Sequence, residues 1–134
     1  YLLERHPADF YEPEGSDKRI ETYNMIIKEV AKCHSCDIID MYRIFTSIGS
    51  IGPQKDSLIR NVENSGAKDG VHPTANGYQI IAASIYQYIE DSKIKPRKVI
   101  CLGDSITAGV WMEGAGTATG QTYPAYLKKL LNNF

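Results

Sequence analysis

Lys-Val-Ile-Cys-Leu-Gly-Asp-Ser-Ile-Thr, residues 98–107, is the part of the sequence that says most about its fold. The first half, residues 98–102, is almost continuously apolar, which is typical of a strand buried on both faces of a parallel sheet. Gly103, Asp104 and Ser105 then favour a turn, and taken alone they explain a simple turn at least as well as a site. Parallel sheets bind ligands beyond the carboxyl ends of their strands. The order strand, glycine, aspartate, serine therefore predicts a serine presented at such an edge.

The sequence on either side predicts helices and one more strand. An amphipathic helix is expected over residues 16–33, a short strand over 37–42 and a helical turn over 57–61. A second long helix follows Pro73, and a third begins near Thr122, which is available as its cap. The residues assigned to the inward faces are Ile20, Tyr23, Ile27, Val30 and Ala31, then Tyr78, Ile81, Ala82, Ile85 and Ile89, and finally Tyr126, Leu127, Leu130 and Leu131.

Strands alternate with helices in this order, which predicts an α/β protein with a flavodoxin-like, three-layer architecture around a parallel sheet. Only two strands are expected, at residues 37–42 and 98–102. Two parallel strands make a poor core. The sheet is therefore expected to be incomplete or permuted in this chain.

The composition limits the classes of function. The 134 residues suit one small domain, and 15 basic residues against 16 acidic ones give a net charge of −1. This balance removes the electrostatic argument for nucleic-acid binding. No apolar run approaches the roughly 18 residues of a membrane span, so a soluble protein without a membrane span is expected. The compartment is left open, with the periplasm and the extracellular space among the alternatives.

A second chemical signal lies at the start of the helix that follows Pro73. Asp69 and His72 stand three residues apart in Asp-Gly-Val-His-Pro. In a tight turn, a carboxylate at this spacing can hold the imidazole Nδ1 and leave Nε2 free as a base. An isolated Asp-x-x-His is more often an ordinary turn with an exposed histidine. Asp69 and His72 therefore indicate a catalytic site only in combination with the Ser105 turn.

Together, strand-Gly103-Asp104-Ser105 and Asp69-x-x-His72-Pro resemble the first and last sequence blocks of the SGNH (GDSL-type) esterase and lipase family. The resemblance covers most of the chain in two pieces. It implies that Ser105 is the nucleophile, that His72 is the general base and that Asp69 orients His72. It also implies that the Ser105 backbone amide donates to the oxyanion, with Gly103 and Asp104 shaping the turn around it.

The chain departs from that family in two respects. The last block precedes the first, and the family's middle blocks, which supply a glycine amide and an asparagine side chain to the oxyanion hole, are absent. Residues 1–91 resemble the C-terminal part of such a domain, 92–97 a linker, and 98–134 the N-terminal part of a second domain. A fragment across the junction of a tandem protein is the simplest explanation, and a shortened circular permutant is the alternative.

The cysteines are interpreted as structural. Cys33 and Cys36 form a C-x-x-C motif, but it lies at the carboxyl end of a helix, where the dipole does not favour a thiolate. A zinc site would need more ligands than these two cysteines and His34. His6 is the only other histidine that has no role in the predicted serine site. We therefore expect no metal and no cofactor. Buried thiols are expected at Cys33 and Cys36, and a small core residue at Cys101.

Three functions compete at this level. The first is a serine esterase that hydrolyses acyl or acetyl esters of carbohydrates or small alcohols. The second is a non-catalytic fragment or interaction domain of a tandem hydrolase, because the oxyanion blocks are missing. The third is a flavodoxin-like anion-binding domain that uses residues 103–107. A small-molecule or carbohydrate ester is the expected partner, and a segment-swapped homo-oligomer would cover the exposed strand edges.

Overall fold

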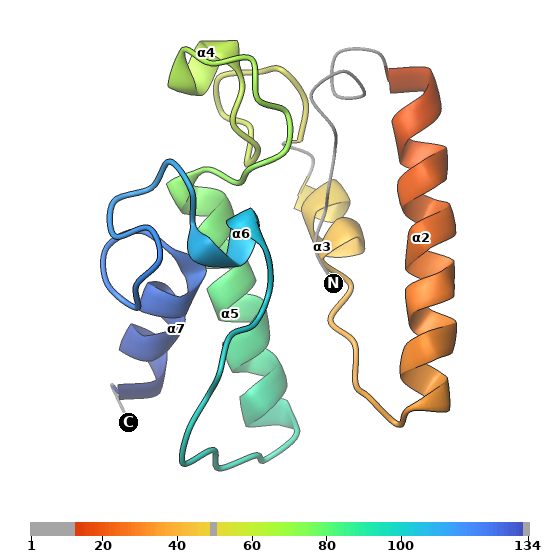
Figure 1. The fold of residues 1–134 in the computed structure, drawn as a ribbon, viewed down its shortest axis with the longest axis vertical. Helices are drawn as coiled ribbons and strands as arrows, with labels where there is room; N and C mark the ends of the chain where they lie inside the picture. Colours follow the sequence, from red (N-terminus) through yellow and green to blue (C-terminus); the bar gives the residue numbers. More distant parts are fainter. Residues whose placement is uncertain (1–12, 49–50, 133–134) are drawn as a thin grey trace. The chain divides into compact units, whose positions relative to one another are not determined.

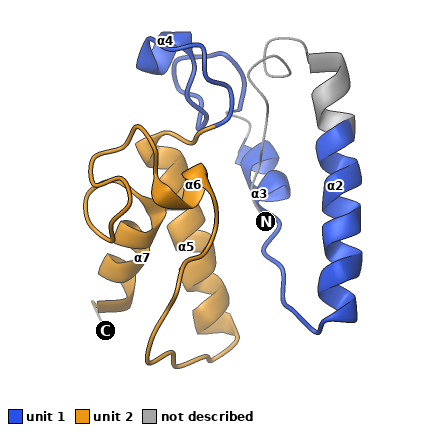
Figure 2. Ribbon diagram, in the orientation of Figure 1, with its two compact units in different colours: residues 1–71 blue, residues 72–134 orange. Residues whose placement is uncertain are grey.

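The computed structural model describes residues 13–48 and 51–132, with side-chain placement from residue 19 onward. Within these residues it contains six helices and no strand (Figure 1). The helices are α2 Pro13–Cys33, α3 Met41–Ile48, α4 Val62–Ser65, α5 Ala75–Asp91, α6 Ser105–Ala108 and α7 Tyr123–Asn132. The chain divides into two compact units, residues 1–71 (unit 1) and residues 72–134 (unit 2), coloured separately in Figure 2. Each unit is described by itself.

The predicted parallel sheet is wrong for the part of the chain that the structure describes. Residues 98–102 have no strand partner there, and α3 begins at Met41, inside the second predicted strand at 37–42. A strand satisfies its backbone groups only by pairing with a neighbour, and this sequence supplies just two short candidates. The α/β, flavodoxin-like fold class is therefore corrected to a mostly helical architecture, and the anion-binding function based on that sheet loses its basis.

Helix α3 forms where a strand was predicted because Asp40 caps it. The Asp40 carboxylate accepts a hydrogen bond from the Arg43 amide at 3.0 Å, and the Asp40 carbonyl accepts one from the Ile44 amide at 3.1 Å. The Lys28 ammonium on α2 donates to the same carboxylate. Met41 and Phe45, four residues apart, are both buried. The side-chain cap and this spacing favour a helix over the β-branched run before it.

Helix α2 confirms the first predicted helix, although it begins at Pro13 rather than near residue 16. Its predicted inward face is only partly buried. Ile20 and Ala31 are buried, whereas Tyr23 and Val30 are 57% and 53% exposed. Neither α2 nor any other helix in the described ranges has the length and apolar character needed to cross a membrane.

The irregular part of unit 1 is organised around the side chain of Asn61. Asn61 is fully buried, accepts from the amide of Asn64 at 3.1 Å, and donates to the carbonyl of Gln54 at 2.8 Å. The Asn64 side chain accepts in return from the Asn61 amide at 2.8 Å, which completes a capping box. The helical turn predicted at 57–61 therefore lies later, at α4, and Asn61 is its cap.

Unit 2 is built on α5, which packs against α7. Tyr78, Ile81, Ala82 and Ile89 are buried on α5, as the sequence predicts, while Ile85 is only partly buried. On α7 the buried residues are Tyr123, Ala125 and Leu127. The prediction is confirmed for Leu127 and wrong for Tyr126, Leu130 and Leu131, which are only partly buried. The Thr122 hydroxyl accepts from the Ala125 amide at 3.3 Å, which confirms Thr122 as the cap of α7.

The buried thiols predicted for the C-x-x-C motif are wrong. Cys33 and Cys36 are free and exposed, because α2 ends at Cys33 and the chain turns away through Ser35, whose φ is 52°. Cys101 is free and partly exposed rather than a core residue. Among the side chains that the structure describes, no three His, Cys, Asp or Glu residues gather as a metal ion would require.

The Asp40 cap predicts a pH-dependent stability of unit 1. Burial raises the pKa of the Asp40 carboxyl, but the bonds from Lys28 and from the Arg43 amide outweigh burial, and the pKa lies below its usual value. The charged form therefore stabilises the fold above the unfolded-state pKa of about 3.9 and loses this effect as the pH falls through the lower folded-state value. We expect Asp40→Ala to cost about 0.5–2 kcal/mol at pH 7, as lost helix caps do.

The measurement is the free energy of urea unfolding, followed by far-UV circular dichroism between pH 2 and pH 7. Asp40→Asn is the matched control, because its side-chain oxygen can still cap α3 but carries no charge. The stability difference between the original chain and Asp40→Asn should be constant above pH 5 and shrink below about pH 4. A difference that grows toward acid pH contradicts the assignment.

Candidate active site

Ser105 is held by a short capped helix in unit 2. It is the first residue of α6, and Asp104 before it is the N-cap, whose carboxylate accepts from the Ile106 amide at 2.9 Å. Ile106 is fully buried and anchors the turn in the core of unit 2. At the other end, the amide of Val110 donates to the Ser105 carbonyl at 3.0 Å. The serine side chain is therefore exposed on a backbone that is fixed on both sides.

Gly103 is needed for the close packing of this turn. A Cβ atom at position 103 would lie 2.2 Å from Thr107 Oγ1 and 2.9 Å from Thr107 Cβ, both far inside van der Waals contact. Thr107 in turn lies 3.2 Å, hydroxyl to hydroxyl, from Tyr123 at the start of α7. Burial raises the pKa of the Tyr123 phenol, and the nearby Cys101 and Asp104 raise it further against the opposing effect of Thr107. The phenol thus stays protonated near neutral pH.

His72 is brought to Ser105 across 33 residues of sequence. The distance from His72 Nε2 to Ser105 Oγ is 3.0 Å, within hydrogen-bond range. His72 stands just before α5, where Pro73 is buried and the Thr74 hydroxyl accepts from the Gly77 amide at 3.3 Å. The cap fixes where the helix begins and therefore where the imidazole is presented. This pairing is the geometry that a serine nucleophile and its base require.

Asp69 belongs to unit 1, and the structure describes its surroundings there. Its carboxylate accepts from the Val71 amide at 3.0 Å and forms an ion pair with Arg60 at 3.4 Å between Oδ2 and Nε. The Gly70 amide donates to the Arg60 carbonyl at 2.9 Å, and Gly70 has a φ of 78°, which glycine adopts without strain. Asp69 is thus a well-buried carboxylate held in a tight turn, with only 9% of its side chain exposed.

One backbone donor beside the Ser105 hydroxyl remains available. As the first residue of α6, Ser105 has an amide without an intrahelical partner, and no hydrogen bond engages it within the described residues. The sequence contains no Gly-x-Asn-Asp block that would supply an asparagine donor of the kind found in SGNH hydrolases. Sequence reasoning missed the contact between Thr107 and Tyr123 that supports this turn. The sequence did contain one indication of it. Thr107 follows Gly103 by four residues, so its side chain lies over the glycine once α6 forms.

Trp111 is the most exposed aromatic side chain near this turn. It follows the Ser105–Val110 hydrogen bond by one residue, is 68% exposed, and has a φ of 70°. A bulky residue at positive φ is uncommon and costs of the order of 1 kcal/mol or more. The strain is therefore local to the loop that leaves α6.

Comparisons with known proteins add no identification. No family model matches the chain, and neither a curated protein nor a solved structure is significantly similar to it. The resemblance to the SGNH blocks, the division at residues 91–98 and the choice between a tandem junction and a permutant therefore stay predictions. The closest physical support for a catalytic site is the His72–Ser105 pair in unit 2.

The Gly103 contact predicts that a single methyl group disrupts the serine turn. In Gly103→Ala the new Cβ meets the Cβ of Thr107, which a rotamer change cannot move. Such overpacking costs about 1–3 kcal/mol. We expect a fall of that size in the free energy of urea unfolding, measured by far-UV circular dichroism.

Gly52→Ala is the matched control. Its added Cβ would meet only the far end of the flexible Gln54 side chain, which can move away. A change within about 0.5 kcal/mol is expected there, as for ordinary surface substitutions. Equal costs at the two positions would show that the Gly103 contact is not specific.

Proposed function

We propose that the chain carries the nucleophile and base of a serine esterase, with Ser105 as nucleophile, His72 as general base and Asp69 as the residue that orients His72. The observation that supports this most directly is the 3.0 Å distance between His72 Nε2 and Ser105 Oγ. His72 directly precedes the capped helix α5 and Ser105 opens the capped helix α6, so each side chain is positioned by its own local structure. The Asp69 role rests on the three-residue spacing to His72.

The first half-reaction transfers the acyl group to the protein. Ser105 Oγ attacks the ester carbonyl carbon while its proton passes to His72 Nε2, and the carbonyl oxygen becomes an oxyanion. The Ser105 amide donates to this oxygen. The C–O bond to the alcohol then breaks as His72 returns the proton to the departing oxygen. The products of this step are a free alcohol and a Ser105 acyl ester.

The second half-reaction repeats the same proton movements with water. His72 Nε2 accepts a proton from a water molecule as that water attacks the acyl carbonyl. The tetrahedral intermediate collapses, the carboxylic acid leaves, and the proton on His72 returns to Ser105 Oγ. No metal ion or redox cofactor takes part in either half.

The surroundings of Ser105 favour small acyl groups. Ser105 is exposed, so an acetyl or other short ester can reach it without a deep acyl tunnel. The alcohol part is a carbohydrate or a small alcohol. With one amide donor in place of three groups, turnover should be slow, because each oxyanion donor is worth about 100- to 1,000-fold.

A non-catalytic interaction domain is the second candidate. The observation in its favour is the exposed apolar segment at residues 99–102. The two candidates make opposite predictions for a covalent serine probe, which needs the activated nucleophile but not full turnover.

Removing either of the proposed catalytic side chains is expected to lower the same ester-hydrolysis activity. The assay is hydrolysis of p-nitrophenyl acetate, with labelling of the chain by a fluorophosphonate as a second measurement. His72→Ala should lower turnover roughly 100- to 10,000-fold, the usual contribution of a general base. Ser105→Ala should remove labelling altogether. The double variant should be no slower than Ser105→Ala, because residues that act as a unit are not additive.

His34→Ala is the control, since His34 is an exposed histidine in the turn after α2. It should leave both hydrolysis and labelling unchanged. Labelling of the original chain at a serine other than Ser105 would overturn the nucleophile assignment. Absence of labelling in the correctly folded original chain would favour the non-catalytic candidate.

Chelation is expected to have no effect on this activity. The proposed proton transfers use only Ser105 and His72, and an activated serine replaces the metal-bound water of a metallohydrolase. Hydrolysis should therefore be unchanged after dialysis against EDTA. A loss that added zinc restores would contradict the mechanism.

A further inference from the structure

The segment between α5 and α6 presents apolar side chains to solvent. Ile100 is 66% exposed and Leu102 is 88% exposed, whereas Val99 is 41% exposed. Cys101 lies on the other side of the segment, beside the Tyr123 side chain at the start of α7. This alternation is the one that an extended strand produces. One face of the segment is therefore turned toward α7, and the face with Ile100 and Leu102 is largely exposed to solvent.

The backbone of the same segment forms no backbone hydrogen bond with the part of the chain that the structure describes. The amide of Ile94 still donates to the Ile89 carbonyl at 3.0 Å and ends α5. From residue 95 to residue 102, no backbone hydrogen bond to the described residues is formed. An extended segment with free amides and carbonyls is a template on which another extended chain can pair. Recognition by strand addition combines this main-chain pairing with pockets for alternate side chains.

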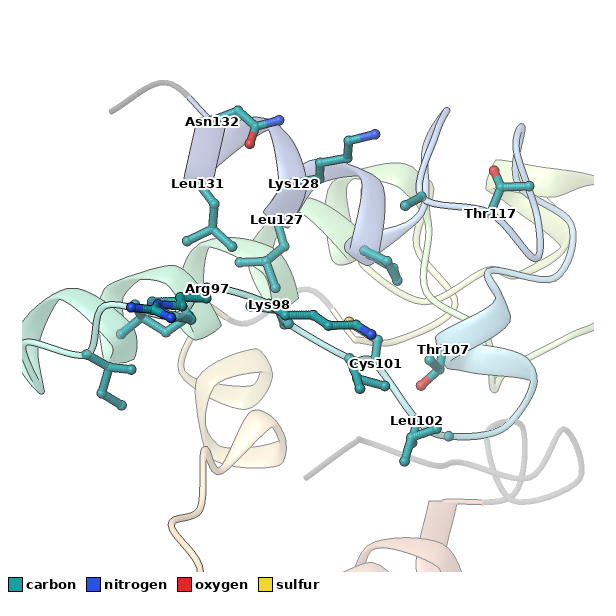
Figure 3. Close-up of a pocket in the computed structure, with 18 of the residues that line it drawn as sticks. Arg97, Lys98, Cys101, Leu102, Thr107, Thr117, Leu127, Lys128, Leu131 and Asn132 are labelled. Atoms are coloured by element: carbon teal, nitrogen blue, oxygen red, sulfur yellow. The ribbon is translucent and has the colours of Figure 1, made fainter.

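A groove of about 1040 Å³ lies beside the segment within unit 2. Figure 3 shows Leu127 and Leu131 of α7 pointing toward residues 97–102, which form its opposite wall. Ile89 and Ile94 also line it. The volume is at the upper end of the range for ligand-binding clefts, and the open shape suits a chain better than a compact ligand. It can receive the apolar side chains of an added strand.

The charges along the groove are mainly positive. Lys95, Arg97, Lys98 and Lys128 line it, against Glu90 and Asp104. Asp104 already accepts from the Ile106 amide as the cap of α6. A second copy of this chain would bring the same excess of cations to the same place, and like charges across paired strands are destabilising. An acidic chain has the complementary charge.

We propose that residues 98–102 and the groove beside α7 bind an extended acidic peptide by strand addition. The main chain of the peptide pairs with the free amides and carbonyls of this segment. Its apolar side chains enter the groove near Leu127 and Leu131, and its Asp and Glu side chains meet Arg97, Lys98 and Lys95. This binding is separate from the esterase proposal, because it uses neither Ser105 nor His72.

The test measures fluorescence anisotropy of a fluorescein-labelled peptide, Glu-Ile-Glu-Val-Asp-Val, titrated with the full chain. The control peptide is Lys-Ile-Lys-Val-Lys-Val, which keeps the apolar residues and reverses the charge. We expect the acidic peptide to bind at least tenfold more tightly. Arg97→Glu with Lys98→Glu should remove that preference, whereas Lys55→Glu, an exposed lysine of unit 1, should change the affinity less than twofold.

The main-chain pairing is tested at Ile100, whose exposure lets it be changed without disturbing the core. Ile100→Pro removes an amide and should weaken binding at least tenfold, because proline cannot donate to a strand ladder. Ile100→Ala keeps the amide and should weaken it much less. Circular dichroism should show the same helix content in both variants.

Three outcomes would overturn the proposal. Equal affinity of Ile100→Pro and Ile100→Ala would mean that the backbone does not pair. Equal binding of a labelled oligonucleotide of twelve deoxythymidines, insensitive to Ile100→Pro, would show a general polyanion site. Dimerisation of the peptide-free chain by sedimentation velocity, lost in Ile100→Pro, would make a second copy the occupant.

Discussion

The packing of α5 against α7 is the constraint on which unit 2 depends. Each helix delivers one side of the candidate site from its amino-terminal end. His72 stands just before α5, and Tyr123 at the start of α7 contacts Thr107 in α6, the short helix that opens with Ser105. If the two helices separated, the 3.0 Å approach of His72 to Ser105 would have no support. The chemistry of the turn is therefore a consequence of helix packing, in which Tyr78 of α5 and Leu127 of α7 are both buried.

The sequence predicted the positions of α5 and α7 along the chain well, because both have caps and apolar residues at helical spacing, although it misplaced the buried face of α7. Thr122 and the run from Tyr78 to Ile89 carry that information locally. The proximity of Ser105 and His72 was also within reach, although only through the resemblance of two short blocks. The residues alone could not predict the contact between Thr107 and Tyr123, since it joins two side chains 16 positions apart that only tertiary packing brings together.

The strands were wrong for a different reason. Apolar and β-branched residues favour a strand because their side chains pack well on the surface of a sheet. They form a strand only when partner strands are present. Residues 98–102 form no helix and have no strand partner among the described residues. At residues 37–42 the local cap from Asp40 prevailed over the apolar run, so the chain became helical from Met41. Local hydrogen bonding thus determined the structure of residues 37–42, and the lack of neighbouring strands determined that of residues 98–102.

The exposed side chain at position 111 has a practical consequence. The chain contains a single tryptophan, and the backbone beside it is tied to the Ser105 carbonyl through the amide of Val110. Its indole is 68% exposed, so its emission responds to quenchers and to molecules that stack on it. The protein therefore carries a built-in optical probe a few residues from the serine. Movements of that loop can be followed in solution without attaching a dye or altering a residue.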